Sequence, residues 1–212
     1  IEESLTNASD PVDGREGKFI IGYKPGTSYS YSGRGYALLQ LLIEEVSTKN
    51  FNQFMKENIF LPLGMNDSSF DIDDIEQERL ASVFTKEGEK TDYRYFSALS
   101  ATSMFTTVND IEKFVNVYSE KDFNSFVKKE LLELTCKPFS ITAKKNLISL
   151  GTFLYKETES NKYMLGHTGG NFPGVFSNIR INQSNGDGII IFTTGKFELI
   201  NNLTNLWMEN QN

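Results

Sequence analysis

The sequence predicts an α+β fold, with part of an antiparallel sheet packed by a C-terminal helix and a largely helical region before it. Apolar residues recur at helical spacing through most of residues 35–134. Short apolar or alternating segments, separated by turn residues, then follow between residues 150 and 194. Helices and strands that are segregated along a chain favour α+β over the alternation of a parallel, doubly wound fold.

The helices are predicted from their apolar periodicity and their end signals. In the first, Leu38, Leu42 and Val46 repeat at helical spacing. The second should stop before Pro62, because proline lacks the amide hydrogen that a continuing helix uses. A later helix should start at Thr107, whose hydroxyl can cap it. The expected helices cover residues 35–47, 51–58, 107–118, 122–134 and 198–208.

Turn residues divide the remaining chain. Residues 1–30 are rich in Gly, Pro, Ser, Thr and Asp, which predicts a loop. Residues 66–95 are acidic and aperiodic, and they lack the sixth-position glycine of a calcium loop, so we expect a solvated surface segment. Asn185-Gly186 predicts a tight turn. The expected strands cover residues 150–155, 163–166, 175–181 and 188–194.

The last predicted strand carries further information. Residues 189–192 are apolar at every position, which suits a strand covered on both faces and hydrogen-bonded on both edges. The strand ending near Ile181 can supply one neighbour. The other edge needs a partner, because an open apolar edge promotes aggregation. We therefore expect an upstream segment or a second chain to complete the sheet.

Composition excludes several classes of function. The net charge of −7 and the lack of a basic patch argue against nucleic-acid binding. One cysteine and one histidine exclude an internal disulfide and a zinc site of nitrogen and sulfur ligands, and no organic cofactor motif is present. No apolar run approaches the roughly 20 residues of a membrane span. The chain opens at Ile1 without a methionine or a signal peptide, so we expect a fragment whose compartment is unknown.

Two segments are hard to explain by packing alone. In the first, a glycine- and hydroxyl-rich loop delivers Tyr31 just ahead of a helix; a tyrosine needs a nearby cation to act as a general base. In the second, glycines flank His167 at the end of a predicted strand, where exposed amide groups can bind an oxyanion. The structural alternatives are tyrosines covering a helix end, and a bulge holding a hydrogen-bonded histidine.

The order of the motifs resembles the serine β-lactamase and penicillin-binding-protein superfamily, and more narrowly the class C-like serine hydrolases and esterases. The resemblance spans about residues 20 to 200. It rests on Tyr31-Ser32-Gly33 and the following helix, Leu61-Pro62-Leu63-Gly64-Met65, the Thr-rich turn at residues 105–114, and Gly166-His167-Thr168-Gly169-Gly170.

The resemblance implies an acyl-enzyme mechanism in which a serine of a Ser-x-x-Lys motif attacks an ester, peptide or lactam carbonyl. Tyr31 would be the general base, and the Gly170 amide would supply half of the oxyanion hole. Tyr31 and His167 would then face each other across one cleft. The implied contacts to substrate or oxyanion are Ser32, Gly33, His167, Thr168, Gly169 and Gly170.

Three departures qualify this resemblance. Gly33 stands where many relatives carry asparagine, and His167 replaces the lysine usual in true β-lactamases, which favours an esterase or peptidase-like role. The letters Ser125-Phe126-Val127-Lys128 follow the Tyr motif on a charged predicted helix, and we interpret them as coincidence. The nucleophile is therefore expected upstream of this chain, which alone should be inactive.

The alternative is a non-catalytic ligand- or peptidoglycan-binding relative that has lost the nucleophile. Under either hypothesis we expect one structural unit, itself incomplete. Its residues 1–150 would carry the Tyr-Ser-Gly motif, and its residues 151–212 would carry the strands, the His-Thr-Gly motif and the last helix.

Overall fold

The computed structural model describes residues 22–119, 126–141, 147–156, 163–171 and 174–210. The chain separates into two compact units. The first consists of Ile1–Ala81 with Arg94–Asp110, and the second of Ser82–Tyr93 with Ile111–Asn212. The predicted assignment of the two motifs to a single unit divided at residue 150 stays a prediction.

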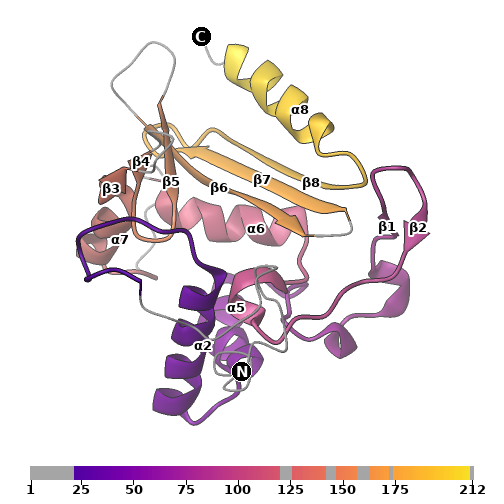
Figure 1. Ribbon diagram of the computed structural model, residues 1–212, viewed down its shortest axis with the longest axis horizontal. Coiled ribbons are helices and arrows are strands. Elements are labelled where there is room, and N and C mark those ends of the chain that lie inside the picture. The colour runs from indigo at the N-terminus through magenta and orange to yellow at the C-terminus, as the bar shows by residue number, and fades with distance from the viewer. Residues whose placement is uncertain (1–21, 120–125, 142–146, 157–162, 172–173, 211–212) are drawn as a thin grey trace. The chain divides into compact units, whose positions relative to one another are not determined.

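The first unit is helical (Figure 1). Its first helix starts where the Ser32 hydroxyl accepts a hydrogen bond from the Gly35 amide at 3.0 Å, a standard N-cap. The next helix is capped in the same way by Asn50, whose side chain accepts from the Gln53 amide. The helical elements are α2 (Gly33–Ser47), α3 (Phe51–Met55), η1 (Lys56–Phe60), α4 (Leu61–Leu63), η2 (Ile72–Asp74), η3 (Gln77–Arg79) and α5 (Leu99–Thr102).

Helix α2 forms as predicted, but it buries a different face. Its buried residues are Arg34, Ala37 and Gln40, whereas the predicted apolar stripe containing Leu38, Leu42 and Val46 is exposed. Ala37 packs against Ala98 near the start of α5. The Gln40 side chain makes two hydrogen bonds to the backbone: its Nε2 donates to the Ser97 carbonyl, and its Oε1 accepts from the Ser100 amide. Small residues and one satisfied polar residue therefore form this contact.

The predicted stop before Pro62 is wrong, because the helical chain continues through α4 to Gly64. The π-helical segment η1 precedes the proline, and its wider turn replaces the α-helical hydrogen-bonding pattern that the proline would interrupt. Phe51 and Phe60, on either side of this wide turn, both contact the Phe70 ring, at centroid distances of 4.9 and 5.8 Å. Gly64 then ends the helix with φ 69°, a left-handed conformation that glycine adopts without strain.

Two further helical predictions have different outcomes. The predicted cap at Thr107 is confirmed, since its hydroxyl accepts from the Asp110 amide at 3.2 Å at the start of α6 (Val108–Val115), which η4 (Asn116–Tyr118) follows. The predicted helix at 122–134 is observed only later, as α7 (Lys129–Cys136). Phe126 and Val127 lie in a turn and a bend, and residues 122–125 fall outside the described part of the chain.

The second unit contains a six-stranded antiparallel sheet in which every strand neighbours the next one along the chain (Figure 1). The four strands predicted from the sequence are present, together with two short ones that were not predicted, β3 and β4. The order is β3 (Ser140–Ile141), β4 (Leu147–Ile148), β5 (Phe153–Lys156), β6 (Tyr163–Asn171), β7 (Val175–Asn182) and β8 (Gly188–Thr194). The predicted turn residue Gly186 adopts φ 75° between the last two strands.

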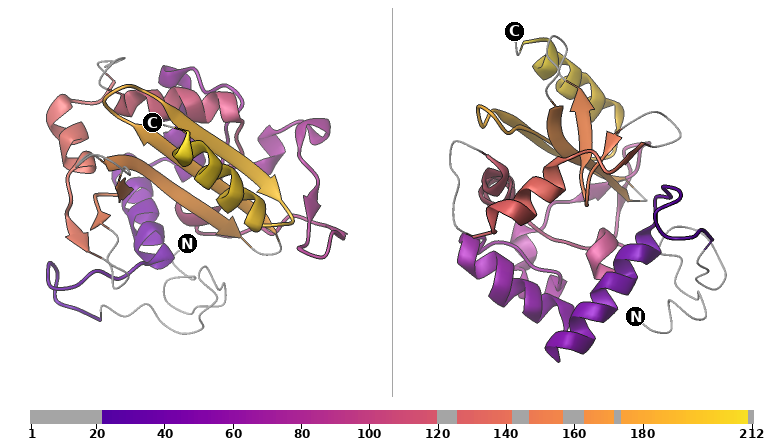
Figure 2. Two further views of the ribbon diagram at one scale, coloured as in Figure 1. Left: turned by 90° about the horizontal axis from the view of Figure 1, so that it is seen from above. Right: turned by 90° about the vertical axis from the view of Figure 1, so that its left-hand side faces the viewer.

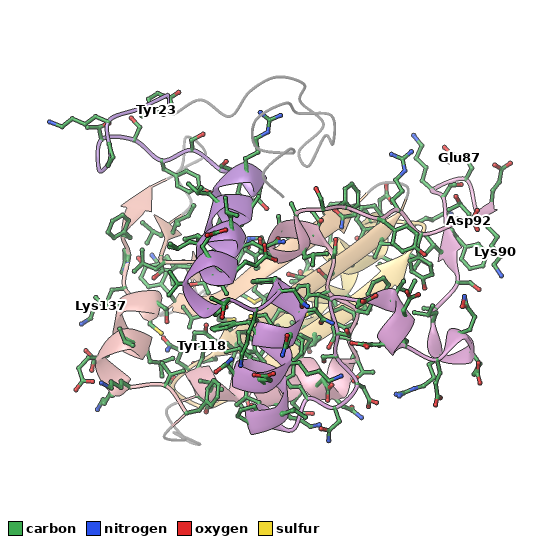
Figure 3. The ribbon with its side chains drawn as sticks, turned by 90° about the horizontal axis from the view of Figure 1, so that it is seen from below. Tyr23, Glu87, Lys90, Asp92, Tyr118 and Lys137 are labelled. Carbon is green, nitrogen blue, oxygen red and sulfur yellow. The ribbon has the colours of Figure 1, made fainter. Side chains whose placement is uncertain are left out.

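One face of this sheet is covered by α8 (Glu198–Glu209), which contacts β7 and β8 (Figure 2). A separate hairpin of β1 (Val83–Phe84) and β2 (Lys90–Thr91) belongs to the same unit, and the charged side chains of Glu87, Lys90 and Asp92 project from it (Figure 3). Within the described ranges, none of the helices has the length and apolar character needed to cross a bilayer.

Strand β8 pairs with β7 along its whole length, as predicted. On its other edge no strand pairs with it among the described residues, and Ile189, Ile190 and Ile191 are half-buried. The prediction of two hydrogen-bonded edges and two covered faces is therefore not met by these residues. The upstream segment or second chain expected to complete the sheet stays a prediction.

Candidate active site

Strand β6 has neighbours on both sides over its first half and on one side over its second half. Its pairing with β5 ends at Phe153↔Gly166, whereas its pairing with β7 continues to Asn171↔Val175. Within the described residues, no strand pairs with residues 168–170 on the β5 side. The His-Thr-Gly-Gly segment therefore lies on a strand whose second half presents one main-chain edge to possible partners.

The close approach of β7 requires a glycine at position 166 and leaves limited room at Gly169 and Gly170. A Cβ atom on Gly166 would lie 2.0 Å from the Ile179 carbonyl oxygen, and one on Gly169 would lie 2.4 Å from the Ser177 hydroxyl oxygen. At Gly170 the nearest atom would be a Phe176 ring carbon at 3.2 Å. The β7 backbone thus accounts for Gly166, whereas Gly169 and Gly170 meet only side-chain atoms. The bulge of the structural alternative is not observed, because β6 pairs with β7 residue by residue through this segment.

The imidazole of His167 is held by its own strand. Nδ1 lies 2.6 Å from the Thr168 carbonyl oxygen, and because a carbonyl only accepts, Nδ1 carries the hydrogen. The ring also contacts Phe153 at a centroid distance of 5.1 Å. Burial lowers the pKa of His167, the Thr168 carbonyl opposes that shift and the Arg180 charge adds to it. The ring is therefore neutral at pH 7, with its Nε2 lone pair as an acceptor.

Tyr31 lies in the first unit, in the loop immediately before α2, with 68% of its surface exposed. Its neighbours Tyr29 and Tyr36 both have a raised pKa, first because they are partly withdrawn from water and then because of the nearby Tyr31. Ser32 uses its hydroxyl as the cap of α2, and Gly33 is the first residue of that helix. Tyr29, Tyr31 and Tyr36 thus lie near one another around the start of α2, and the role of Tyr31 as a general base stays a prediction.

Tyr31 belongs to the first unit and His167 to the second. Their predicted meeting across one cleft stays a prediction, as do the substrate and oxyanion roles of Ser32, Gly33, Thr168, Gly169 and Gly170. Ser125 lies outside the described residues, and Phe126 and Val127 that follow it are not helical, so the charged helix expected there is not observed.

A buried carboxylate that the sequence analysis treated only as part of a helix start organises the loop after α4. Asp110 is 1% exposed, and its Oδ2 accepts from the Asp67 amide and from the Ser68 hydroxyl, both at 2.8 Å. Thr106 also bonds to the Ser68 hydroxyl at 2.8 Å. The Thr-rich turn and the segment after Leu61-Pro62-Leu63-Gly64-Met65 are thereby joined within the first unit.

A second group was also missed, on β5 and β7. Arg180 is only 7% exposed, and its guanidinium carbon lies 3.3 Å from the centre of the Tyr155 ring. The sequence signal that could have found this group is an arginine inside the predicted strand at residues 175–181. In the described part of the chain, no group of three or more His, Cys, Asp or Glu side chains could hold a metal ion.

The β-lactamase family model matches residues 20–203, which is most of the chain. The chain belongs to the β-lactamase family. Among curated β-lactamase relatives, penicillin-binding protein 4* of Bacillus subtilis (strain 168) is 29% identical over 138 residues, covering 57% of this chain and 31% of that protein. Protein flp of Staphylococcus aureus (strain MRSA252) is 23% identical over 211 residues, covering 94% and 40%. The chain thus spans less than half of each.

Solved β-lactamase-like structures share the fold. The octameric penicillin-binding protein homologue from Pyrococcus abyssi aligns with a TM-score of 0.71 and 24% identity, covering 82% of this chain and 40% of that one. The β-lactamase/D-alanine carboxypeptidase from Pseudomonas syringae aligns with a TM-score of 0.75 and 14% identity, covering 92% and 63%. The predicted superfamily and the predicted α+β, β-lactamase-like fold are confirmed.

Proposed function

We propose that this chain is part of a serine hydrolase that acts through an acyl-enzyme on an ester or peptide carbonyl. The observation that carries the proposal is the second half of β6, where β7 pairs with one edge and no described strand pairs with residues 168–170 on the other. An extended substrate can add to such an edge through main-chain hydrogen bonds. Membership of the β-lactamase family supports the proposal that substrate binds along this edge of β6.

In the proposed reaction, a serine hydroxyl from outside this chain attacks the carbonyl carbon, and its proton passes to Tyr31. The carbon–oxygen bond to serine forms, the bond to the leaving group breaks, and the leaving group takes up the proton. Water then hydrolyses the acyl-serine ester and restores the hydroxyl. The Gly170 amide would donate to the carbonyl oxygen as it gains negative charge, which is the interaction that lowers the barrier most in acyl transfer.

The neutral protonation state of His167 favours substrates that place an uncharged group beside this side chain. Burial keeps the ring neutral at pH 7, so it offers no fixed positive charge to a substrate carboxylate. We therefore propose that esters or peptides are better substrates than penicillins, whose carboxylate needs a cation. Lowering the pH through the His167 pKa should then raise reactivity toward penicillin relative to a neutral ester.

The decisive experiment uses the natural full-length protein. It is treated with a fluorescent penicillin and with a fluorophosphonate, and the adduct is measured by intact mass and located by peptide mapping. We expect a covalent adduct on a serine of a Ser-x-x-Lys motif outside this chain, lost when that serine becomes alanine. Labelling that survives this substitution contradicts the assignment.

Tyr31 has a matched control within the first unit. Tyr31→Phe should slow labelling about 100-fold or more, as expected for loss of a general base. Tyr95→Phe should leave it unchanged, because Tyr95 is 67% exposed, close to the 68% of Tyr31. Equal rates in the two variants would remove Tyr31 from the mechanism. Reversible ligand binding without any mass adduct would instead support the non-catalytic alternative.

A further inference from the structure

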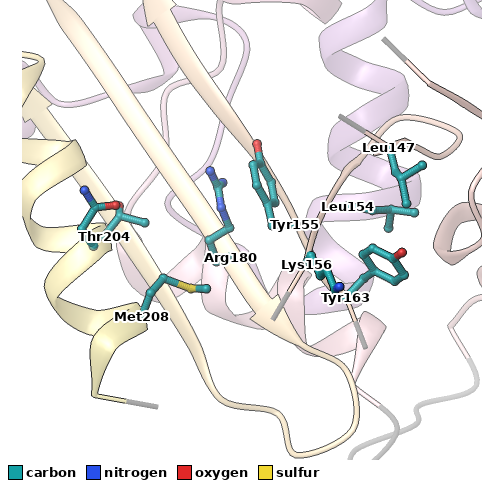
Figure 4. A pocket seen from close by; sticks show the side chains of 9 residues that line it. Leu147, Leu154, Tyr155, Lys156, Tyr163, Arg180, Thr204 and Met208 are labelled. Carbon is teal, nitrogen blue, oxygen red and sulfur yellow. The ribbon is translucent and has the colours of Figure 1, made fainter. Parts of the chain in front are cut away.

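A cavity of about 440 Å³ lies in the second unit, between β4–β7 and α8 (Figure 4). Its size falls within the range of small-molecule sites, roughly 300–1,000 Å³. Part of its wall is apolar, from Leu147, Leu154 and Met208. The rest carries hydrogen-bond donors and positive charge, from Tyr155, Tyr163, Lys156, Arg180 and, on α8, Thr204 and Asn205.

The buried charge of this wall is not balanced by an acid. Arg180 donates one hydrogen bond, from Nη1 to the Ile179 carbonyl at 2.7 Å, and stacks on Tyr155. Among the described residues, no carboxylate lies within ion-pair distance of it. A guanidinium has five donors in a planar fork that fits a carboxylate. Removing such a charge from water without an anionic partner is costly, and stacking on a ring offsets only part of the cost.

The polar groups around Arg180 are similarly incomplete. Asn178 precedes it by two positions on β7, so both side chains point to the α8 face. Asn178 donates through Nδ2 to Thr204, whose own hydrogen goes to the Ile200 carbonyl. That arrangement fixes the orientation of the amide, and its buried Oδ1 has no hydrogen-bond partner in the described part of the chain. The hydroxyls of Tyr155 and Tyr163 make no hydrogen bond to any other described residue.

We propose that this cavity binds a small amphiphilic carboxylate, with its head group on Arg180 and Tyr155 and its apolar body against Met208. The guanidinium and the Tyr155 hydroxyl point the same way along the wall (Figure 4), so both can donate to one carboxylate. The site lies on the sheet face under α8 and is built from the second unit alone. It is therefore independent of the proposed hydrolase chemistry.

The test titrates octanoate into the full-length protein by calorimetry, with octanamide as the uncharged control. Octanoate should bind at least about tenfold more tightly, and Arg180→Gln should weaken octanoate about 10- to 100-fold while changing octanamide little. Lys156→Gln, at an exposed position, should weaken it about threefold, which keeps the test valid if Arg180→Gln does not fold. Lys137→Gln, also exposed but outside the cavity, serves as the matched control.

Methyl NMR of ¹³C-labelled methionine locates the ligand. The Met208 signal should shift with octanoate, and that of Met65, buried in the first unit, should not. Equal affinity for octanoate and octanamide, or undiminished octanoate binding in both Arg180→Gln and Lys156→Gln, would overturn the proposal. So would a complete lack of binding, the result expected if another segment of the full-length protein fills the cavity.

Discussion

Two buried polar regions of this molecule differ in how completely their groups are paired. In the first unit, Asp110 receives hydrogen bonds from Asp67 and Ser68, and nearby Asp74 receives them from Ser69 and Asn52. The bonds to Asp74 lower its pKa, although Asp74 itself is exposed; the buried member of this region is Asp110. Under α8, by contrast, the described residues supply no partner for the buried Asn178 oxygen and no acid that balances Arg180.

This difference distinguishes a polar region that maintains the fold from one that can bind a ligand. A network whose members satisfy one another gains rigidity and needs nothing from outside. A buried group without a partner costs free energy in the empty state, and a ligand that supplies the partner recovers it. Pairing is therefore a more useful guide to function here than burial alone, since Asp110 and Asn178 are equally buried, at 1% exposure each.

The largest expected effect concerns the backbone beside Arg180. Gly166→Ala would place a carbon 2.0 Å from the Ile179 carbonyl oxygen, so β6 and β7 must separate. We expect a loss of about 4 kcal/mol in the free energy of unfolding, measured with urea. Gly22→Ala is the control, because no atom of the described residues lies within 4 Å of that added carbon. A tolerated Gly166→Ala would show that this face of the sheet adapts easily.

The next effect tests the paired network. Asp110→Ala removes the acceptor of the Asp67 amide and the Ser68 hydroxyl, and the Ser68 side chain is buried. We expect a loss of about 3 kcal/mol by the same measurement. Asp92→Ala, at an exposed position, should change stability by less than about 0.5 kcal/mol. Similar small losses in both would mean that the network contributes little.

A smaller effect tests the incompletely paired face. Thr204→Val removes the acceptor of the Asn178 amide and should cost about 1 kcal/mol. Adding Asn178→Leu should recover most of that loss, because the double variant removes both polar members of this pair and leaves neither buried without the other. Thermal unfolding of the two single variants and the double variant measures this coupling. Additive losses would argue against our description of the Asn178 amide.

The smallest effect is a pH dependence. Because burial lowers the folded-state pKa of His167, the unfolded chain binds more protons, so stability should rise as the pH increases toward the unfolded value of about 6.5 and level off above it. His167 is the only histidine, so His167→Gln should flatten the profile between about pH 5 and 7. A profile that falls with rising pH would contradict the direction of the shift.

Local sequence signals predicted the elements well. Helical spacing located α2, α6 and α8, a hydroxyl cap marked the start of α6, and turn residues separated the strands from β5 onward. The same signals missed β3 and β4, since two-residue strands show no periodicity. They also predicted the wrong buried face of α2. Packing against Ala98 determines which face of this helix is buried, and Leu38 stays exposed.

The candidate site was less predictable, because its features depend on pairing between distant segments. The His-Thr-Gly letters located β6, but only the register shows that β5 stops at Gly166 while β7 continues. The stacking of Arg180 on Tyr155 joins residues 25 positions apart on two strands, which no local pattern encodes. Residue types thus indicated candidate site residues, whereas the sheet topology determined which side chains lie next to one another.

The wide turn of η1 bears on how relatives of this chain can vary in length. Phe51 and Phe60 are nine positions apart and would lie on opposite sides of a regular α-helix, yet both contact Phe70. Positions i and i+8 share one side of an α-helix, so removing a single residue between them would restore the regular winding and keep both rings on Phe70. Homologues one residue shorter here can therefore retain the same aromatic cluster.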